Sequence, residues 1–177
     1  MKHKPLPVIV FLTLMLSSLL AGRHSYCTAK EELTTDLNQA LALIIREKTK
    51  PVITQDTIRT YKQLRKVSGG KVLIAVSDER FCRYLKNKRL KESAFITFDV
   101  VDNQYAGHAT DKPAICSDTL IIEDPVLKET LALKSYAQLS AAAVFGMSDQ
   151  RLPGGLMATA ILWAIGSMLY LRKREKE

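Results

Sequence analysis

Three cysteines, at positions 27, 82 and 116, are the most reactive side chains in this 177-residue sequence. In an oxidising compartment Cys82 and Cys116 could form a disulfide, which would leave Cys27 free or paired between subunits. Buried free thiols would suit the same positions, because cysteine packs as a small apolar residue. Neither the cysteines nor the histidines at 3, 24 and 108 have the spacing of metal ligands, so we expect no metal and no cofactor.

A basic stretch, RFCRYLKNKRLK at 80–91, is the second candidate site. In a cytoplasmic protein, basic residues interleaved with aromatic ones would suggest nucleic acid. In an exported domain they would instead attract anionic head groups or an acidic ligand. A run of like charges is also typical of a solvated helix face, so both interpretations stay open. The residues of this possible anionic-surface patch are Arg80, Arg83, Lys86, Lys88, Arg89 and Lys91.

Carboxylates are plentiful, but their positions favour turns over catalysis. The aspartates at 99, 102, 111, 118 and 124 lie near the ends of predicted strands, where aspartate commonly stabilises turns. The sequence contains no nucleophile elbow, H-E-x-x-H, P-loop or dinucleotide-binding glycine pattern. We therefore do not expect an enzyme.

Both ends of the sequence are apolar. Residues 5–22 carry no charge and would span roughly 27 Å as a helix, which predicts a first transmembrane helix or signal anchor at 1–22. A cleavable signal peptide is the alternative, with a tolerable cleavage site after Ala29. Residues 152–171 predict a second transmembrane helix, followed by a basic tail at 172–177. Because both ends are basic, both termini are expected in the cytoplasm and residues 23–151 outside it.

The segment between the spans predicts a small α+β domain. Apolar residues from Leu33 to Ile45 recur at helical spacing, opposite charged positions such as Asp36 and Glu47, so we expect a juxtamembrane helix at 28–50. It is either continuous with the first span or offset by a short kink. A helix at 54–67, capped by Thr54 or Asp56, a strand at 71–78 and a single basic helix at 79–93 follow. Strands at 94–107, 114–125 and 127–140 then complete an antiparallel sheet as a three-stranded meander.

The junction with the second span lies in the stretch SYAQLSAAAVFGMSDQRLP at 135–153. Its beginning completes the sheet, and residues 141–147 predict a short helix or turn. Capping and turn residues then precede the membrane surface. The junction residues are Tyr136, Phe145, Ser148, Asp149 and Arg151.

A long helix leading into a small mixed domain between two spans resembles the PAS-like extracytoplasmic part of bacterial membrane sensors. Four stretches, TTDLNQALALIIREK, TQDTIRTYK, CSDT and YAQLSAAAVFGMSDQRLP, are similar to a family of bacterial membrane-anchored helix-turn-helix regulators. In that family a similar exported domain lies between two spans and is followed by a cytoplasmic winged-helix domain that binds DNA. The resemblance implies an inner-membrane location with residues 23–151 in the periplasm. Because only residues 172–177 follow the second span, we expect the output domain to be missing and this chain to make no direct contact with nucleic acid.

These observations favour a non-enzymatic membrane sensor, in which the exported domain detects a ligand, partner or envelope state and transmits it through the second span. Its partners would be the lipid bilayer and either another protein or a second copy, bound through the transmembrane and juxtamembrane helices. A structural or accessory subunit of a membrane-envelope complex is the alternative. A secreted or singly anchored binding protein is a third, if the first apolar segment is cleaved.

Overall fold

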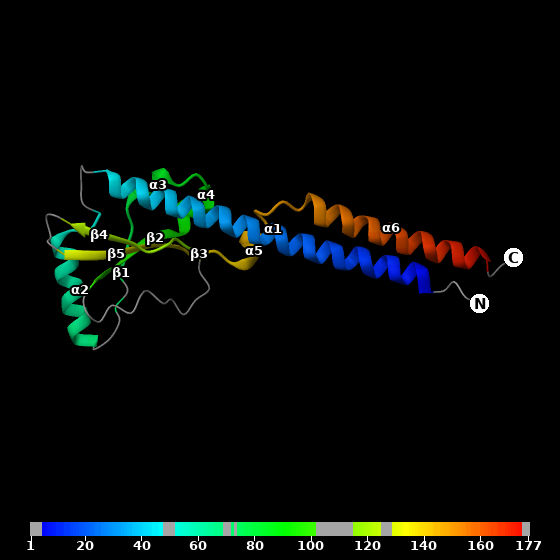
Figure 1. Ribbon diagram of the computed structural model, residues 1–177, viewed down its shortest axis with the longest axis horizontal. Helices are drawn as coiled ribbons and strands as arrows, with labels where there is room; N and C mark the ends of the chain where they lie inside the picture. The colour runs from blue at the N-terminus through cyan, green and yellow to red at the C-terminus, as the bar shows by residue number, and fades with distance from the viewer. Residues whose placement is uncertain are drawn as a thin grey trace. The chain divides into compact units, whose positions relative to one another are not determined.

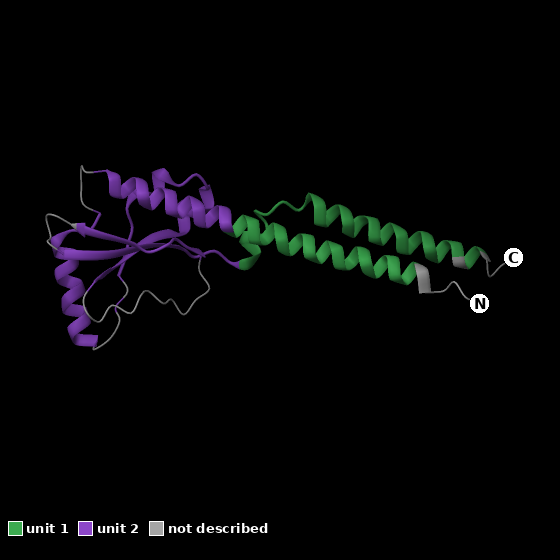
Figure 2. Ribbon diagram, viewed as in Figure 1, with its two compact units in different colours: residues 1–30, 141–177 green, residues 31–140 purple. Residues whose placement is uncertain are grey.

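A computed structural model describes residues 5–47, 52–68, 72, 74–101, 115–124 and 129–174. It divides into two compact units, one made of residues 1–30 and 141–177 and the other of residues 31–140 (Figure 2). The aspartates at 102 and 111, the end of the strand expected at 94–107 and the last residues of the basic tail lie outside the described residues.

Two long helices dominate the first unit (Figure 1). Helix α1 covers Pro5–Arg46 and continues into the second unit, while α6 covers Arg151–Arg174. A short helix, α5, covers Ala141–Phe145. The stretches Pro7–Arg46 and Arg151–Tyr170 are long and apolar enough to cross a membrane, judged by length and composition. The apolar stretch within 1–22 and the helix expected from residue 28 onward are therefore parts of one helix without a break between them.

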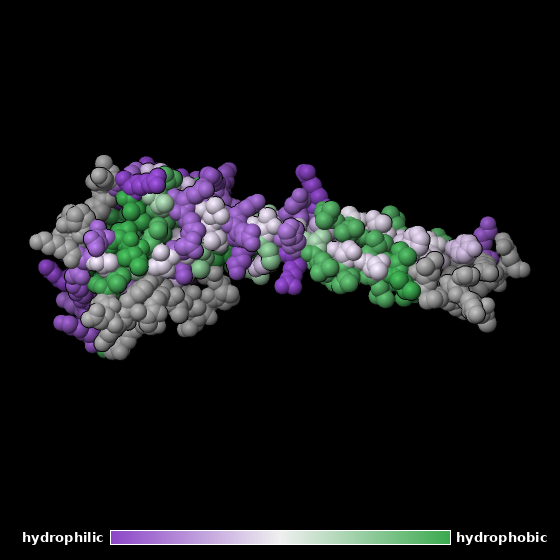
Figure 3. All heavy atoms as spheres, viewed as in Figure 1, coloured by the Kyte–Doolittle hydropathy of each residue, from purple (hydrophilic) through white to green (hydrophobic). Residues whose placement is uncertain are grey.

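Within the first unit, α1 and α6 run antiparallel. The Ser18 hydroxyl donates to the Pro153 carbonyl at 2.9 Å, and the Trp163 indole N–H donates to the Pro7 carbonyl at 3.3 Å. The residue number of the contact falls along α1 while it rises along α6, so the two helices run in opposite directions. Their outward side chains are largely apolar (Figure 3), as expected for helices that face lipid.

The second unit has a core between helices and a sheet. The second half of α1 buries an apolar stripe that recurs every three or four residues, and helix α2, Gln55–Ser68, buries Ile58 and Tyr61. Thr54 caps α2, because its hydroxyl accepts from the Thr57 N–H at 3.3 Å. The buried residues of α1 in this unit include Leu33, Leu37, Ala40, Leu41 and Ile44.

The strands form one antiparallel sheet with the order β1-β2-β5-β3, and β4 also pairs with β5. The expected meander is wrong, because β2 pairs directly with β5, from Ala94 opposite Ala137 to Val100 opposite Leu131. This register places the apolar side chains of both strands on the same face of the sheet. The order of the strands along the sequence does not reveal such a pairing, because β2 and β5 are far apart in the chain. The strands are β1 Ile74–Val76, β2 Ala94–Val100, β3 Ile115–Cys116, β4 Leu120–Asp124 and β5 Glu129–Ala137.

The strand expected at 114–125 is interrupted, since β3 and β4 pair with the same side of β5 at different points. Cys116 lies opposite Tyr136, and Leu120 lies opposite Leu133. Four residue steps from β3 to β4 therefore match only three residue steps along β5. One extra residue of this kind is a β-bulge. Across the interruption, the Ser117 N–H donates to the Ser135 carbonyl at 2.9 Å, and the Ser135 N–H donates to the Ser117 hydroxyl at 2.9 Å.

The single basic helix expected at 79–93 is also wrong. Two short helices take its place, α3 at Glu79–Tyr84 and α4 at Lys88–Ser93. Asn87 ends the intervening turn and caps α4 by accepting from the Arg89 N–H at 3.0 Å. The inward positions of this segment are confirmed: Phe81, Leu85 and Leu90 are buried.

Candidate functional site

Polar side chains on and just after the second half of α1 bind two other parts of the second unit. We call Asp36, Asn38, Gln39 and Glu47 the α1 anchor, since each of them contacts a segment distant in the sequence. Together they join α1 to the α3–α4 segment and to the bulge between β3 and β4.

Asp36 holds the turn between α3 and α4. Its carboxylate accepts the Lys86 N–H at 3.0 and 3.1 Å and the Asn87 N–H at 3.0 Å. The residue is only 8% exposed, so these backbone donors replace water around its charge. The sequence pattern had placed Asp36 on the solvent face of the helix, and its burial corrects that expectation. The available signal was its spacing, three residues after Leu33 and four before Ala40, within the apolar stripe.

Asn38 holds the bulge. Its amide nitrogen donates to the Asp118 carboxylate at 2.9 Å, and its amide oxygen accepts the Asp118 N–H at 2.8 Å. An amide side chain can satisfy a donor and an acceptor at once, and this pair uses both. Asp118 therefore acts in the bulge, as the turn interpretation of the aspartates implied.

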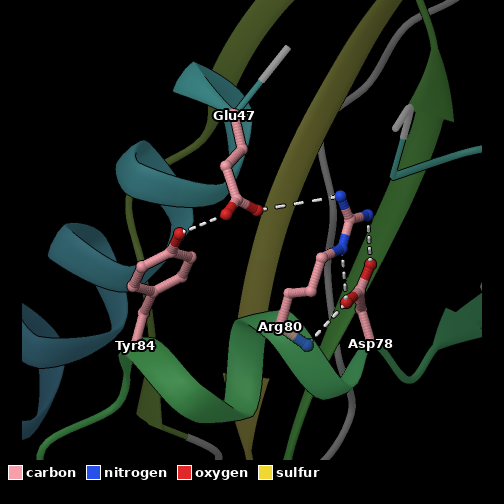
Figure 4. A network of polar contacts seen from close by, with 4 residues as sticks. All are labelled: Glu47, Asp78, Arg80 and Tyr84. Carbon is pink, nitrogen blue, oxygen red and sulfur yellow. Dashed lines mark hydrogen bonds and ion pairs between the residues drawn. The ribbon is translucent and has the colours of Figure 1, made fainter. Parts of the chain in front are cut away.

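A charged network lies at the end of α1 (Figure 4). Glu47 accepts the Tyr84 hydroxyl at 2.6 Å, and its second oxygen lies 3.7 Å from the Arg80 guanidinium. The same guanidinium donates to the Asp78 carboxylate at 2.8 Å, and Asp78 also accepts the Arg80 N–H at 2.8 Å, which caps α3. The side-chain hydrogen bond from Arg80 lowers the pKa of Asp78, while the bond to Glu47 raises the pKa of Tyr84.

The residues of the possible anionic-surface patch, all exposed except Arg80, differ in their contacts. Arg80 is half-buried in the network of Figure 4, and the Lys86 ammonium donates to the Gln39 side chain at 3.0 Å. The remaining members, Arg83, Lys88, Arg89 and Lys91, are exposed. Two of the six residues thus bind the α1 anchor or its network, and binding of an anionic surface by the exposed residues stays a prediction.

The cysteines carry no bond to one another in the structure. Cys27, on α1, is exposed, while Cys82 on α3 and Cys116 on β3 are half-buried free thiols. The disulfide between Cys82 and Cys116 stays a prediction for the oxidised protein. Among the described residues, no group of three or more histidine, cysteine or acidic side chains could hold a metal ion.

The junction residues fall into two groups. Tyr136 is a buried residue of β5, where its ring stacks on Phe95 at 5.8 Å between centroids. The others precede or begin α6: the Ser148 hydroxyl donates to the Phe145 carbonyl at 2.7 Å, and Asp149 accepts the Arg151 N–H at 2.9 Å. Asp149 thereby caps the start of α6, with Phe145 and Arg151 exposed.

Sequence reasoning also missed the partner of a buried tyrosine, Tyr61. The Tyr61 hydroxyl donates to Asp99, and the Tyr61 ring lies 5.3 Å from that of Phe98. Burial, together with the Asp99 carboxylate, raises the pKa of Tyr61 to about 12. The helical spacing from Ile58 to Tyr61 indicated burial, but nothing in the sequence identified the partner.

Chemically, the α1 anchor holds backbone N–H groups, the Asp118 carboxylate and the Arg80 guanidinium around one helix. No family model, curated protein or solved structure matches the chain. The resemblance to membrane-anchored regulators therefore stays a prediction from the four quoted stretches.

Proposed function

We propose that this chain is a non-enzymatic sensor of the bacterial inner membrane, with a PAS-like periplasmic domain at residues 23–151 and both termini in the cytoplasm. The domain detects a ligand, a partner or an envelope state, and the change reaches the membrane helices. A protein partner or a second copy would bind through the transmembrane and juxtamembrane helices.

The observation that carries the proposal is the continuity of α1. One helix contains both a stretch apolar enough to cross a membrane and the buried residues of the sheet unit. A helix transmits a rotation or shift along its length because its backbone hydrogen bonds are internal. A change in how the sheet unit holds the second half of α1 would therefore alter its first half.

The α1 anchor supplies the element that a signal would bias. Asp36 and Asn38 bind backbone N–H groups of two different loops, so a rearrangement of either loop changes the contacts of the same helix. A ligand shifts such an equilibrium only by its differential affinity for the two arrangements. Weakening the anchor by mutation imitates that shift without requiring the ligand.

Disulfide cross-linking between α1 and α6 tests the proposal. A Cβ at Gly22 would lie 3.9 Å from the Pro153 Cβ, within the range of about 3.5–4.5 Å that disulfides require. Gly22→Cys and Pro153→Cys are introduced into the full chain with the three natural cysteines replaced by alanine. The rate of oxidative cross-linking in membranes is then compared between the parent, Asp36→Ala and Asn38→Ala.

We expect Asp36→Ala and Asn38→Ala to change the cross-linking rate by at least about threefold, since a difference of about 0.7 kcal/mol between arrangements has that effect. Glu32→Ala is the matched control, because Glu32 is an exposed acid one turn before Asp36. If both anchor variants cross-link at the rate of Glu32→Ala while hydrogen exchange shows the anchored loops released, the helix does not transmit. That result would overturn the sensor and favour the structural or accessory subunit.

A further inference from the structure

A basic hollow lies on the second unit, away from the contacts of the α1 anchor. It is open, with a volume of about 480 Å³, and is lined by α2 and the first residue of β5. Small-molecule sites commonly have volumes of about 300–1,000 Å³. Figure 3 shows hydrophilic side chains along α2, at the lower left of the view.

The hollow is positively charged. Among the described residues that line it, Arg59, Lys62 and Lys66 are basic and Glu129 is acidic, which gives this part of the lining a net charge of +2. Glu129 forms an ion pair with Lys62. Within the described part of the chain, no carboxylate lies within ion-pair distance of Arg59 or Lys66.

The spacing of these cations follows from the helix. Arg59 and Lys66 lie three residues before and four residues after Lys62, so all three project on one side of α2. Like charges at this spacing repel one another and destabilise a helix, and a bound anion would remove that repulsion. Seven residues of helix separate Arg59 from Lys66 by about 10 Å.

Neutral hydrogen-bonding groups stand beside the charges. The side chains of Gln55 and Gln63 line the same hollow, and each amide can both donate and accept. Hydroxyl groups match this property, because a hydroxyl is also donor and acceptor. The buried Ile58 contributes apolar surface to the lining.

We propose that this hollow binds an anionic saccharide, a sugar carrying two phosphate or carboxylate groups. The two negative groups pair with Arg59 and with Lys66, and the sugar hydroxyls bind the glutamine amides. The proposal goes beyond the sensor function, because the hollow can bind such a ligand whether or not α1 transmits a signal.

Binding to the full chain in uncharged detergent tests the proposal by isothermal titration calorimetry. The probes are glucose 1,6-bisphosphate, glucose 6-phosphate and pyrophosphate. We expect the bisphosphate to bind at least tenfold more tightly than either of the others, since only it combines two separated charges with hydroxyls. Pyrophosphate binding as tightly as the bisphosphate would overturn the saccharide assignment, as would no heat from the bisphosphate at millimolar concentration.

Two matched variants locate the site. Arg59→Gln with Lys66→Gln should weaken bisphosphate binding at least tenfold, and Lys88→Gln with Lys91→Gln, which removes the same charge from exposed positions of α4, should leave it unchanged. Glu129→Gln should strengthen binding severalfold, because it frees Lys62. Equal weakening by the α2 and α4 variants would show attraction to net charge alone and refute the hollow as the site, whereas the cross-linking test of the sensor would be unaffected.

Discussion

Replacing Asp36 with alanine should release the turn between α3 and α4. The substitution removes the carboxylate that accepts two part-buried backbone donors, those of Lys86 and Asn87. An unsatisfied buried donor costs about 1–3 kcal/mol, and entry of water at this 8% exposed position reduces the sum of the two costs. We expect a loss of roughly 2–4 kcal/mol in the free energy that holds this turn.

Amide hydrogen exchange measures that loss at the two donors themselves. A cost of about 2 kcal/mol corresponds to exchange about 30-fold faster at Lys86 and Asn87, while amides in the centre of β5 should change far less. Asp36→Asn should lie between the parent and Asp36→Ala, since it keeps one oxygen acceptor. Unchanged exchange at Lys86 and Asn87, or an equal change in Glu32→Ala, would refute the role assigned to this carboxylate.

Three further predictions concern stability. Tyr61→Phe removes a hydroxyl whose pKa burial raises to about 12. The folded state therefore holds this proton more tightly than the unfolded chain, and urea titrations should show the stability advantage of the parent over the variant shrinking between about pH 10 and pH 12. Leu37→Ala, at a position with no exposure, should lower the free energy of unfolding by about 2–5 kcal/mol. Leu43→Ala on the same helix, where Leu43 is 43% exposed, should lower it by less than about 1 kcal/mol in the same titration. Equal losses in the two variants would contradict the packing described. A double-mutant cycle of Asn38→Ala and Asp118→Ala should give a coupling energy of about 0.5–1.5 kcal/mol, and strict additivity would show that the reciprocal hydrogen bonds contribute nothing.

The elements that periodicity defines were predictable from the sequence. The apolar stripe from Leu33 to Ile44 and the helix capped by Thr54 follow from spacing and capping, and the structure has both. The mixture of helices with a small antiparallel sheet also followed from the change of period after residue 93. These features depend on residues close together in the chain.

The errors depend on residues far apart. The break between α3 and α4 coincides with N–H groups that Asp36 accepts from about fifty positions away, a contact that local spacing cannot contain. The same holds for the bulge at Ser117–Thr119, whose Asp118 binds Asn38, and for the pairing of β2 with β5. The α1 anchor was missed because its members look like ordinary solvent-facing polar residues until the loops that they bind are placed.

The position of β5 has a consequence for how the domain folds. Among the described residues it is the last strand, yet β2, β3 and β4 all pair with it. Until residues 129–137 have been synthesised, the earlier strands lack the partner that joins them, and their apolar faces cannot close over the core. Sheets that depend on distant pairings form slowly, since the intervening chain must be ordered first. The nascent domain is therefore most vulnerable to aggregation and proteolysis just before its final strand arrives.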